Sequence, residues 1–169
     1  MSKTITGSGR AAHGTAAGGV YTPHTIHIAS DHAGFSLKNT IIDHLKADLK
    51  CTIEDHGADN TQSCDYPVFA RALCKAVLAG GGLGILVCGS GLGMSMMANR
   101  FRGIRAAACA NEFLAIAARR HNNANVLCLG ERVVGPGLAL AIVDAFLQNE
   151  FEGGRHQGRI VMFDRDLDA

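Results

Sequence analysis

A cysteine between an apolar run and a glycine-rich loop is the side chain of this sequence best placed for chemistry. Cys88 ends the run Gly84-Ile-Leu-Val-Cys and leads directly into Gly89-Ser-Gly-Leu-Gly-Met-Ser, which opens a predicted helix. A short apolar run ending in such a loop is typical of a buried parallel strand. The loop amides and the helix N-terminus can stabilise an anion, and the same positive potential favours thiolate over thiol. The alternative is a packed structural thiol above an ordinary tight turn.

The glycine loop does not match the common nucleotide-binding patterns. A dinucleotide motif needs G-x-G-x-x-G/A, but Gly89-Ser-Gly91 is followed three residues later by Met94, and Gly91-Leu-Gly93 by Met96. The G-K-[ST] sequence of an ATPase-type phosphate loop is absent as well. We therefore expect the loop to bind a small oxyanion, and not the pyrophosphate of a cofactor.

The elements that must position this loop alternate along the chain from Thr25 onward, with short apolar runs separating longer amphipathic segments. The predicted strands are Ile26–Ala29, Thr52–Asp55, Leu83–Cys88, Ala106–Ala110 and Val126–Leu129, and the predicted helices are Ser36–Leu49, Pro67–Ala79, Met94–Phe101, Glu112–His121 and Pro136–Leu147. Five strands, each followed by a helix, predict an α/β fold with a five-stranded, mostly parallel sheet covered by helices on both faces. Such sheets bind ligands beyond the carboxyl ends of their strands.

Three other polar side chains follow predicted strands. Asp31 and His32 come directly after the first strand, and Arg132 lies just beyond the fifth. Because the carboxyl ends of parallel strands share one edge, we expect these residues to converge with the glycine loop. Each also has an ordinary explanation: Asp31 as a helix cap, His32 as a solvated loop residue and Arg132 as a surface charge.

Two further features are less readily placed by topology. His121 closes the fourth predicted helix, where a histidine also interacts favourably with the helix dipole. Arg155 and Arg159 are four residues apart, so on a helical turn they would present one cationic face. Alone, such a pair is typical of a solvated surface. If the segment folds back on the carboxyl edge, or reaches the edge of a partner, it forms a phosphate clamp.

Composition limits the classes of protein. A length of 169 residues favours one domain. The chain contains 16 Lys and Arg against 15 Asp and Glu, without a long run of one sign, so its charge gives no sign of a nucleic-acid or membrane partner. No apolar stretch is long enough for a membrane span, and we expect a cytoplasmic protein. The six cysteines form no C-x-x-C pair and predict reduced thiols, neither a disulfide framework nor a zinc cage: Cys51, Cys64, Cys74, Cys88, Cys109 and Cys128.

The first 23 residues differ from the rest. Met1 to Pro23 is rich in Gly, Ala, Ser and Thr and contains no acidic residue, which predicts a flexible leader or an added extension outside the fold. A weak organelle-targeting signal is the alternative. Residues 24–169 are expected to form a single domain with a C-terminal arm.

Six short motifs occur in a specific order: Ser30-Asp-His-Ala-Gly, Asp65-Tyr-Pro, Cys88-Gly-Ser-Gly-Leu-Gly, Arg120-His-Asn, Gly130-Glu-Arg-Val-Val-Gly and Gly154-Arg-His-Gln-Gly-Arg. Together they resemble the ribose-5-phosphate isomerase B family, which also contains the galactose-6-phosphate isomerase subunits. The resemblance spans about residues 26–160. It implies a three-layer Rossmann-like α/β/α sandwich and a homodimer with active sites at the subunit interface, with a tetramer left open. The implied activity interconverts ribose 5-phosphate and ribulose 5-phosphate through an enediolate, without a metal or an organic cofactor.

The resemblance also implies roles for individual residues. Cys88 corresponds to the base, and Ser90, where relatives often have Thr, to the hydroxyl that relays protons. His121 corresponds to the histidine that opens the sugar ring, and Asp31 helps to orient the substrate hydroxyls. The other matching positions bind the sugar or its phosphate: His32, Tyr66, Gly89, Gly91, Leu92, Gly93, Ser95, Asn122, Arg132, Arg155 and Arg159.

One departure within the family bears on the mechanism. Members that lack the cysteine carry a glutamate just after the third loop glycine, and this chain has Met94 there. The resemblance therefore implies that the chain belongs to the cysteine-dependent branch. Two alternatives remain: an isomerase for a six-carbon sugar phosphate, such as galactose 6-phosphate or allose 6-phosphate, and a noncatalytic flavodoxin-like module that binds phosphosugars. A metal-dependent aldolase is disfavoured because no H-x-x-x-H or clustered His/Glu ligand set appears.

Overall fold

The computed structural model describes residues 3–6, 25–48 and 52–163. Within these ranges the chain forms one six-stranded sheet with the strand order β1-β3-β2-β4-β6-β5. The strands are β1 (Lys3–Thr6), β2 (Ile26–Ser30), β3 (Thr52–Asp55), β4 (Leu83–Cys88), β5 (Ala106–Ala108) and β6 (Val126–Gly130). Strands β2 to β6 are mutually parallel, which confirms the predicted five-stranded parallel sheet.

The sixth strand lies in a segment for which the sequence predicts no element. β1 pairs antiparallel with β3, and Thr4 lies opposite Glu54. Its sequence Lys-Thr-Ile-Thr contains three β-branched residues, which favour a strand, but it is too short and polar to stand out from the glycine-rich residues around it. The prediction of a leader outside the fold therefore does not hold for Lys3–Thr6. The rest of the predicted leader, residues 1–2 and 7–23, lies outside the described residues.

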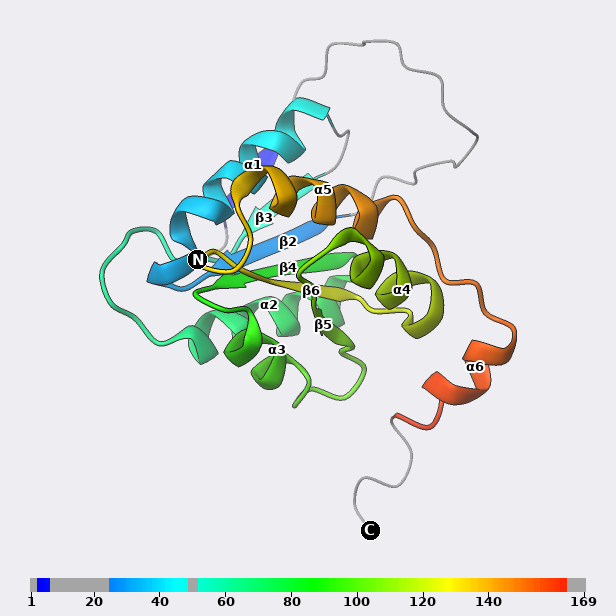
Figure 1. Ribbon diagram of the computed structural model, residues 1–169. Coiled ribbons are helices and arrows are strands. Elements are labelled where there is room, and N and C mark those ends of the chain that lie inside the picture. Colours follow the sequence, from blue (N-terminus) through cyan, green and yellow to red (C-terminus); the bar gives the residue numbers. More distant parts are fainter. Residues whose placement is uncertain (1–2, 7–24, 49–51, 164–169) are drawn as a thin grey trace.

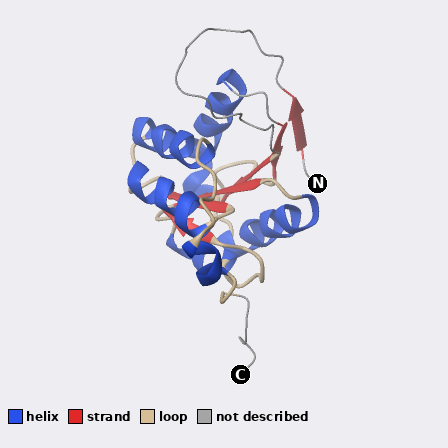
Figure 2. Cartoon of the chain, turned by 90° about the vertical axis from the view of Figure 1, so that its right-hand side faces the viewer, coloured by secondary structure: helices blue, strands red, loops and turns tan. Residues whose placement is uncertain are grey.

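Helices cover both faces of the sheet (Figures 1 and 2). On one face lie α1 (Phe35–Asp48), α4 (Glu112–Asn122) and α5 (Pro136–Leu147), and on the other lie α2 (Tyr66–Gly80) and α3 (Leu92–Ala98). A 3-10 turn, η1 (His32–Gly34), connects β2 to α1, and a short helix, α6 (Arg155–Ile160), follows the main body. This arrangement confirms the predicted three-layer α/β sandwich. In the described part of the chain no helix is long and apolar enough to cross a membrane.

The sheet separates two apolar cores. In β2, Ile26 and Ile28 face the core beneath α1 and α5, whereas Ala29 faces the core beneath α2 and α3. All residues of β4 are buried, from Leu83 to Cys88, because both faces of this central strand are covered. This explains why β4 reads as a continuous apolar run in the sequence and not as an alternating one. The run ends where the sheet meets solvent, and this places Cys88 at the carboxyl edge.

Candidate active site

Cys88 lies at the last position of β4 and its sulfur faces the glycine loop. The Gly91 backbone N–H donates a hydrogen bond to Cys88 Sγ at an N to S distance of 3.1 Å. Gly91 adopts a positive φ of 78°, so the chain turns sharply there and α3 begins at the next residue. The side chain is buried, but its sulfur contacts a main-chain donor. The fold therefore places a main-chain donor directly on the sulfur of Cys88.

The other buried cysteines have a different environment. Burial raises the pKa of the Cys74 thiol and of the Cys109 thiol to about 11, and it raises the pKa of Cys128 well above its ordinary value. These three thiols lie within the core and stay protonated at neutral pH. All five cysteines that the structure describes are free thiols, in agreement with the predicted reduced state.

Glycines allow the loop to pack closely against its neighbours. A Cβ added at Gly130 would lie 2.6 Å from the Ser90 carbonyl carbon, and one added at Gly93 would lie 2.7 Å from Cζ of Tyr66. The Tyr66 ring therefore lies directly on the loop backbone. The loop is held between β6 and the start of α2, so its amides have fixed positions relative to Cys88.

Asp31 lies beside the end of β4, and His32 contacts the segment that precedes α2. The Asp31 carboxylate accepts hydrogen bonds from Ala33 N at 2.9 Å and Gly34 N at 3.1 Å, so it caps η1 as one interpretation of the sequence predicts. The Asp31 N–H donates to Val87 O at 3.2 Å, which places Asp31 beside the end of β4. His32 Nδ1 lies 3.2 Å from the backbone N of Cys64, two residues before Tyr66.

Arg132 lies over the first loop residue. Its backbone N–H donates to Gly89 O at 3.1 Å, and a Cβ added at Gly89 would lie 3.4 Å from Arg132 Nη1. The structure therefore brings the predicted residues that follow β2, β4 and β6 to one edge of the sheet. We call this set the carboxyl-edge group: Asp31, His32, Tyr66, Cys88, Gly89, Ser90, Gly91, Leu92, Gly93, Ser95 and Arg132.

The remaining predicted residues form a second cluster near α4 and α6. The His121 ring stacks on the His156 ring, with centroids 4.5 Å apart and planes 10° apart. His121 Nε2 lies 3.8 Å from Glu152 Oε2, and Arg120 Nε donates to Glu152 Oε1 at 2.6 Å. We call this set the α4–α6 group: His121, Asn122, Glu152, Arg155, His156 and Arg159.

Neighbouring cations affect the α4–α6 group. Desolvation and the nearby positive charges of His121, Arg155 and Arg159 lower the pKa of His156, while Glu152 opposes this effect. His156 and Glu152 are absent from the sequence-predicted site. The signal that could have found them is positional: His156 follows Arg155 directly, and Glu152 precedes His156 by four residues.

Within one chain, the two groups lie at opposite ends of the parallel strands. Asn125, four residues after His121, accepts a hydrogen bond from Gly84 N at 2.8 Å through its carbonyl oxygen. Gly84 precedes Cys88 by four residues on β4, a rise of about 13 Å at roughly 3.3 Å per residue. In Figure 1 the loops after β2 and β4 lie at the left of the sheet, and α6 lies at the right beyond α4. The α4–α6 group therefore does not fold back on the carboxyl edge of its own chain.

The described residues contain two groups of three side chains that could hold a metal ion, although the sequence predicts no such set. One is His121, Glu152 and His156, within the α4–α6 group, and the other is His27, Glu54 and His56. Neither group includes Cys88. The sequence pattern does not reveal them because the ligand atoms come from different elements.

The fold and the carboxyl-edge group together define a doubly covered parallel α/β domain with a thiol and main-chain donors at its carboxyl edge. The sequence profile of the Ribose/Galactose Isomerase family matches residues 26–163. The chain belongs to this family, as its motifs predict.

Individual relatives agree with this assignment. The chain is 46% identical over 137 residues to ribose-5-phosphate isomerase B of Escherichia coli, covering 80% of this chain and 91% of the relative. Among solved structures, it resembles a ribose 5-phosphate isomerase of Thermotoga maritima at 47% identity and a TM-score of 0.82, covering 85% of this chain and 99% of that one. It also resembles ribose-5-phosphate isomerase B of Mycoplasma genitalium with bound ribulose-5-phosphate, at 44% identity and a TM-score of 0.79, covering 83% and 94% of the two chains.

Proposed function

We propose that this chain is an aldose-ketose isomerase that interconverts ribose 5-phosphate and ribulose 5-phosphate, with Cys88 as the base. The observation that carries the proposal is the Gly91 N–H donating to Cys88 Sγ at 3.1 Å, at the carboxyl edge of the sheet. Relatives at 46% and 47% identity are named for this activity, which supports the choice of substrate. The reaction moves hydrogen within one molecule, so it needs no external oxidant or reductant.

The proposed chemistry is a proton transfer between two neighbouring carbons. The Cys88 thiolate removes the proton from C2 of the open-chain aldose, and the electron pair moves onto the carbonyl oxygen to give an enediolate. The same sulfur then delivers the proton to C1, while the Ser90 hydroxyl relays the proton between the two oxygens. Amide N–H groups of the loop from Gly89 to Gly93 stabilise the developing oxyanion, an effect of preorganised donors that costs little reorganisation.

The other residues of the carboxyl-edge group orient the substrate. Asp31 uses one carboxylate oxygen to cap η1, and the other orients substrate hydroxyls. Tyr66 is partly exposed where its ring lies on Gly93, and it lines the pocket. His32 and Arg132 contribute to the phosphate end. A guanidinium suits this role because it stays charged and can bind two phosphate oxygens at once.

The complete site is proposed to form across a homodimer. His121 would open the sugar ring, Asn122 would contact the sugar, and Arg155 and Arg159 would bind the phosphate. In one chain these residues lie at the edge of the sheet opposite Cys88, so they cannot reach a substrate held there. In a two-fold symmetric dimer the α4–α6 group of each subunit can meet the carboxyl-edge group of the other. Each dimer would then contain two composite sites.

The substrate assignment is tested by a direct comparison of sugar phosphates. We expect kcat/KM of the full chain to be highest for ribose 5-phosphate and lower for allose 6-phosphate and galactose 6-phosphate. A preference for either six-carbon substrate would contradict the ribose assignment but retain the isomerase. A noncatalytic phosphosugar-binding module would bind the sugar phosphate and exchange no proton at C2 with solvent, which would contradict both.

A further inference from the structure

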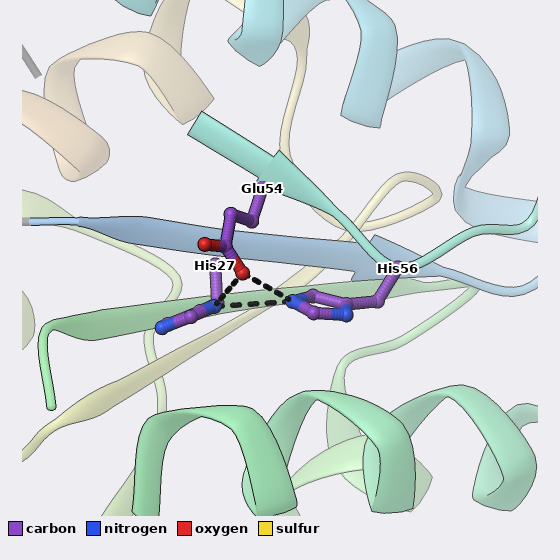
Figure 3. A group of neighbouring side chains, drawn as sticks. All are labelled: His27, Glu54 and His56. Atoms are coloured by element: carbon purple, nitrogen blue, oxygen red, sulfur yellow. Dashed lines mark hydrogen bonds and ion pairs between the residues drawn. The ribbon is translucent and has the colours of Figure 1, made fainter. Parts of the chain in front are cut away.

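A partly buried group of two histidines and a glutamate lies on the α2 side of the sheet, away from the proposed active site (Figure 3). His27 lies on β2 opposite Glu54 on β3, and His56 follows β3. His27 Nδ1 lies 3.1 Å from His56 Nε2 and 3.4 Å from Glu54 Oε2, and His56 Nε2 lies 3.9 Å from the same carboxylate oxygen. Three possible ligand atoms thus face one another.

These separations suit a tetrahedral metal ion. With bonds of about 2.0–2.1 Å to nitrogen and oxygen, neighbouring ligands of tetrahedral Zn²⁺ lie roughly 3.3 Å apart. The separation of 3.1 Å between His27 Nδ1 and His56 Nε2 and that of 3.4 Å between His27 Nδ1 and Glu54 Oε2 lie close to this value. A rotation of the Glu54 carboxylate would shorten the third separation, 3.9 Å between His56 Nε2 and Glu54 Oε2. Two imidazole nitrogens and one carboxylate oxygen are a donor set for Zn²⁺, whereas Mg²⁺ and Ca²⁺ prefer oxygen ligands only.

The orientation of His27 is fixed by a second partner. His27 Nε2 lies 3.1 Å from Gly81 O, and because a carbonyl oxygen only accepts, Nε2 carries the proton. In the neutral ring the lone pair of Nδ1 then points toward Glu54 and His56. A metal-bound histidine typically donates its other N–H to a backbone carbonyl or carboxylate in the same way. This contact therefore preorganises His27 as a ligand.

The state of His56 also fits a ligand. The His56 side chain is 9% exposed, and its Nε2 faces both His27 Nδ1 and the Glu54 carboxylate. A neutral imidazole can carry its proton on either nitrogen, so His56 can free Nε2 without a change of charge. Without a metal, an N–H donated by His56 Nε2 to His27 Nδ1 would satisfy both rings, and this hydrogen bond is the competing explanation of the group.

We propose that His27, Glu54 and His56 form a Zn²⁺ site with three protein ligands. Three protein ligands leave the fourth tetrahedral position to water. Glu54 has 31% of its side chain exposed, which gives the ion a route from solvent, whereas His27 is almost fully buried. The bound ion would join β2 to the end of β3 and would stabilise the folded chain by mass action.

The proposed zinc site is separate from the proposed isomerase chemistry. His27 lies opposite Gly84 in the β2–β4 pairing, and Cys88 is four residues further along β4, about 13 Å at roughly 3.3 Å per residue. An ion held by His27 and His56 cannot contact the thiol. The ion would therefore take no part in the proposed isomerase chemistry, and its removal should leave that reaction intact.

The test is titration of the metal-free full chain with Zn²⁺ by calorimetry. We expect one ion bound at this group, and the variants His27→Gln and His56→Gln should each bind it more than about tenfold more weakly, since loss of even an outer partner of a ligand costs roughly 10–100-fold. His44→Gln and His156→Gln are matched controls, one in a surface ion pair and one in the other His-Glu-His group, and both should retain the affinity for this site. Equal affinity in His27→Gln, His56→Gln and the unsubstituted chain would overturn the proposal.

A second measurement does not depend on the variants folding. The unsubstituted chain loaded with Co²⁺ should show the strong visible absorption of a tetrahedral ion without a thiolate charge-transfer band, because the proposed ligands contain no sulfur. A weak octahedral spectrum, or a thiolate band from Cys64 or Cys88, would contradict the site. Retained isomerase activity with a chelator present, together with a lower melting temperature, would support the structural role.

Discussion

The Gly91 backbone N–H donates a hydrogen bond to the Cys88 sulfur at 3.1 Å, three residues along the chain. This contact joins the end of the central strand to the first turn of α3, so the thiol and the loop donors move as one unit. Cys74, Cys109 and Cys128 are surrounded by apolar neighbours, and their pKa values are raised by burial. Cys88 shares an apolar cluster with Cys74 and Cys128, but its sulfur also accepts a hydrogen bond from a main-chain N–H of the glycine loop.

Co-expression of two inactive variants tests the composite site. Cys88→Ala and His121→Asn should each lose most isomerase activity alone, but a mixed dimer pairs the intact Cys88 of one chain with the intact His121 of the other. With random pairing, about a quarter of the normal activity should return, because half of the dimers are mixed and each has one complete site.

The control combines two variants from the same edge. Cys88→Ala co-expressed with Asp31→Asn should regain nothing, since every site in the mixed dimer lacks one of the two groups. No recovery in the Cys88→Ala and His121→Asn mixture, with mixed dimers shown to be present, would mean that the site is not shared between subunits.

Gly130→Ala should destabilise the fold and displace the loop. The added Cβ would lie 2.6 Å from the Ser90 carbonyl carbon, and backbone cannot rotate away as a flexible side chain does. Overpacking of this kind costs about 1–3 kcal/mol in the free energy of unfolding, measured by urea denaturation. Gly137→Ala is the matched control, because nothing lies within 4 Å of its added Cβ. Equal stability of the two variants would contradict the close packing of the loop.

Lys38 forms a buried ion pair whose loss should be costly. Its Nζ donates to both Asp55 carboxylate oxygens at 2.8 Å and to Ala58 O at 2.7 Å, and the side chain is 1% exposed. Lys38→Met leaves the Asp55 charge without its partner, so we expect a loss of about 3–5 kcal/mol in the free energy of unfolding.

The control for this pair is Lys46→Met. Lys46 lies 3.9 Å from Asp43 in an exposed pair, which should contribute about 0–1 kcal/mol. If calorimetric unfolding gave Lys38→Met and Lys46→Met the same stability, the buried pair would contribute no more than an exposed one.

Alkaline pH should weaken the fold through the buried thiols. Burial raises the pKa of Cys74 from 9.0 to about 11, so between these values the unfolded chain has released a proton that the folded chain still holds. Stability from this group is complete below pH 9 and is lost as the pH rises toward 11. The stability difference between the unsubstituted chain and Cys74→Ala, followed by urea denaturation, should therefore shrink from pH 8 to pH 11. A constant difference would show that Cys74 ionises equally in both states.

The parts of the fold predictable from sequence are those specified by local patterns. β4 and its loop can be predicted because a fully apolar run ends at glycines. α3 starts at Leu92, two residues earlier than predicted, because the chain turns at Gly91, which has a positive φ. β1 was not predictable, since four residues with one aliphatic side chain carry little signal until β3 is present to pair with them.

The candidate sites show the same division between local and long-range information. Residues directly after β2, β4 and β6 could be assigned to one edge because parallel strands share it. The His27–Glu54–His56 group depends on the β2–β3 register, which a single sequence does not specify. Similarly, the stacking of His121 on His156 depends on how the segment after α5 returns to α4.

Deuterium incorporation from heavy water into ribose 5-phosphate and its product, followed by NMR, tests the role of Cys88 most directly. The unsubstituted chain should incorporate deuterium at C2 of ribose 5-phosphate and C1 of ribulose 5-phosphate. Cys88→Ala should slow this incorporation by about 10²–10⁴-fold while still binding the sugar phosphate, and Cys74→Ala should retain it. Incorporation by Cys88→Ala at the unsubstituted rate would contradict the assignment of Cys88 as the base.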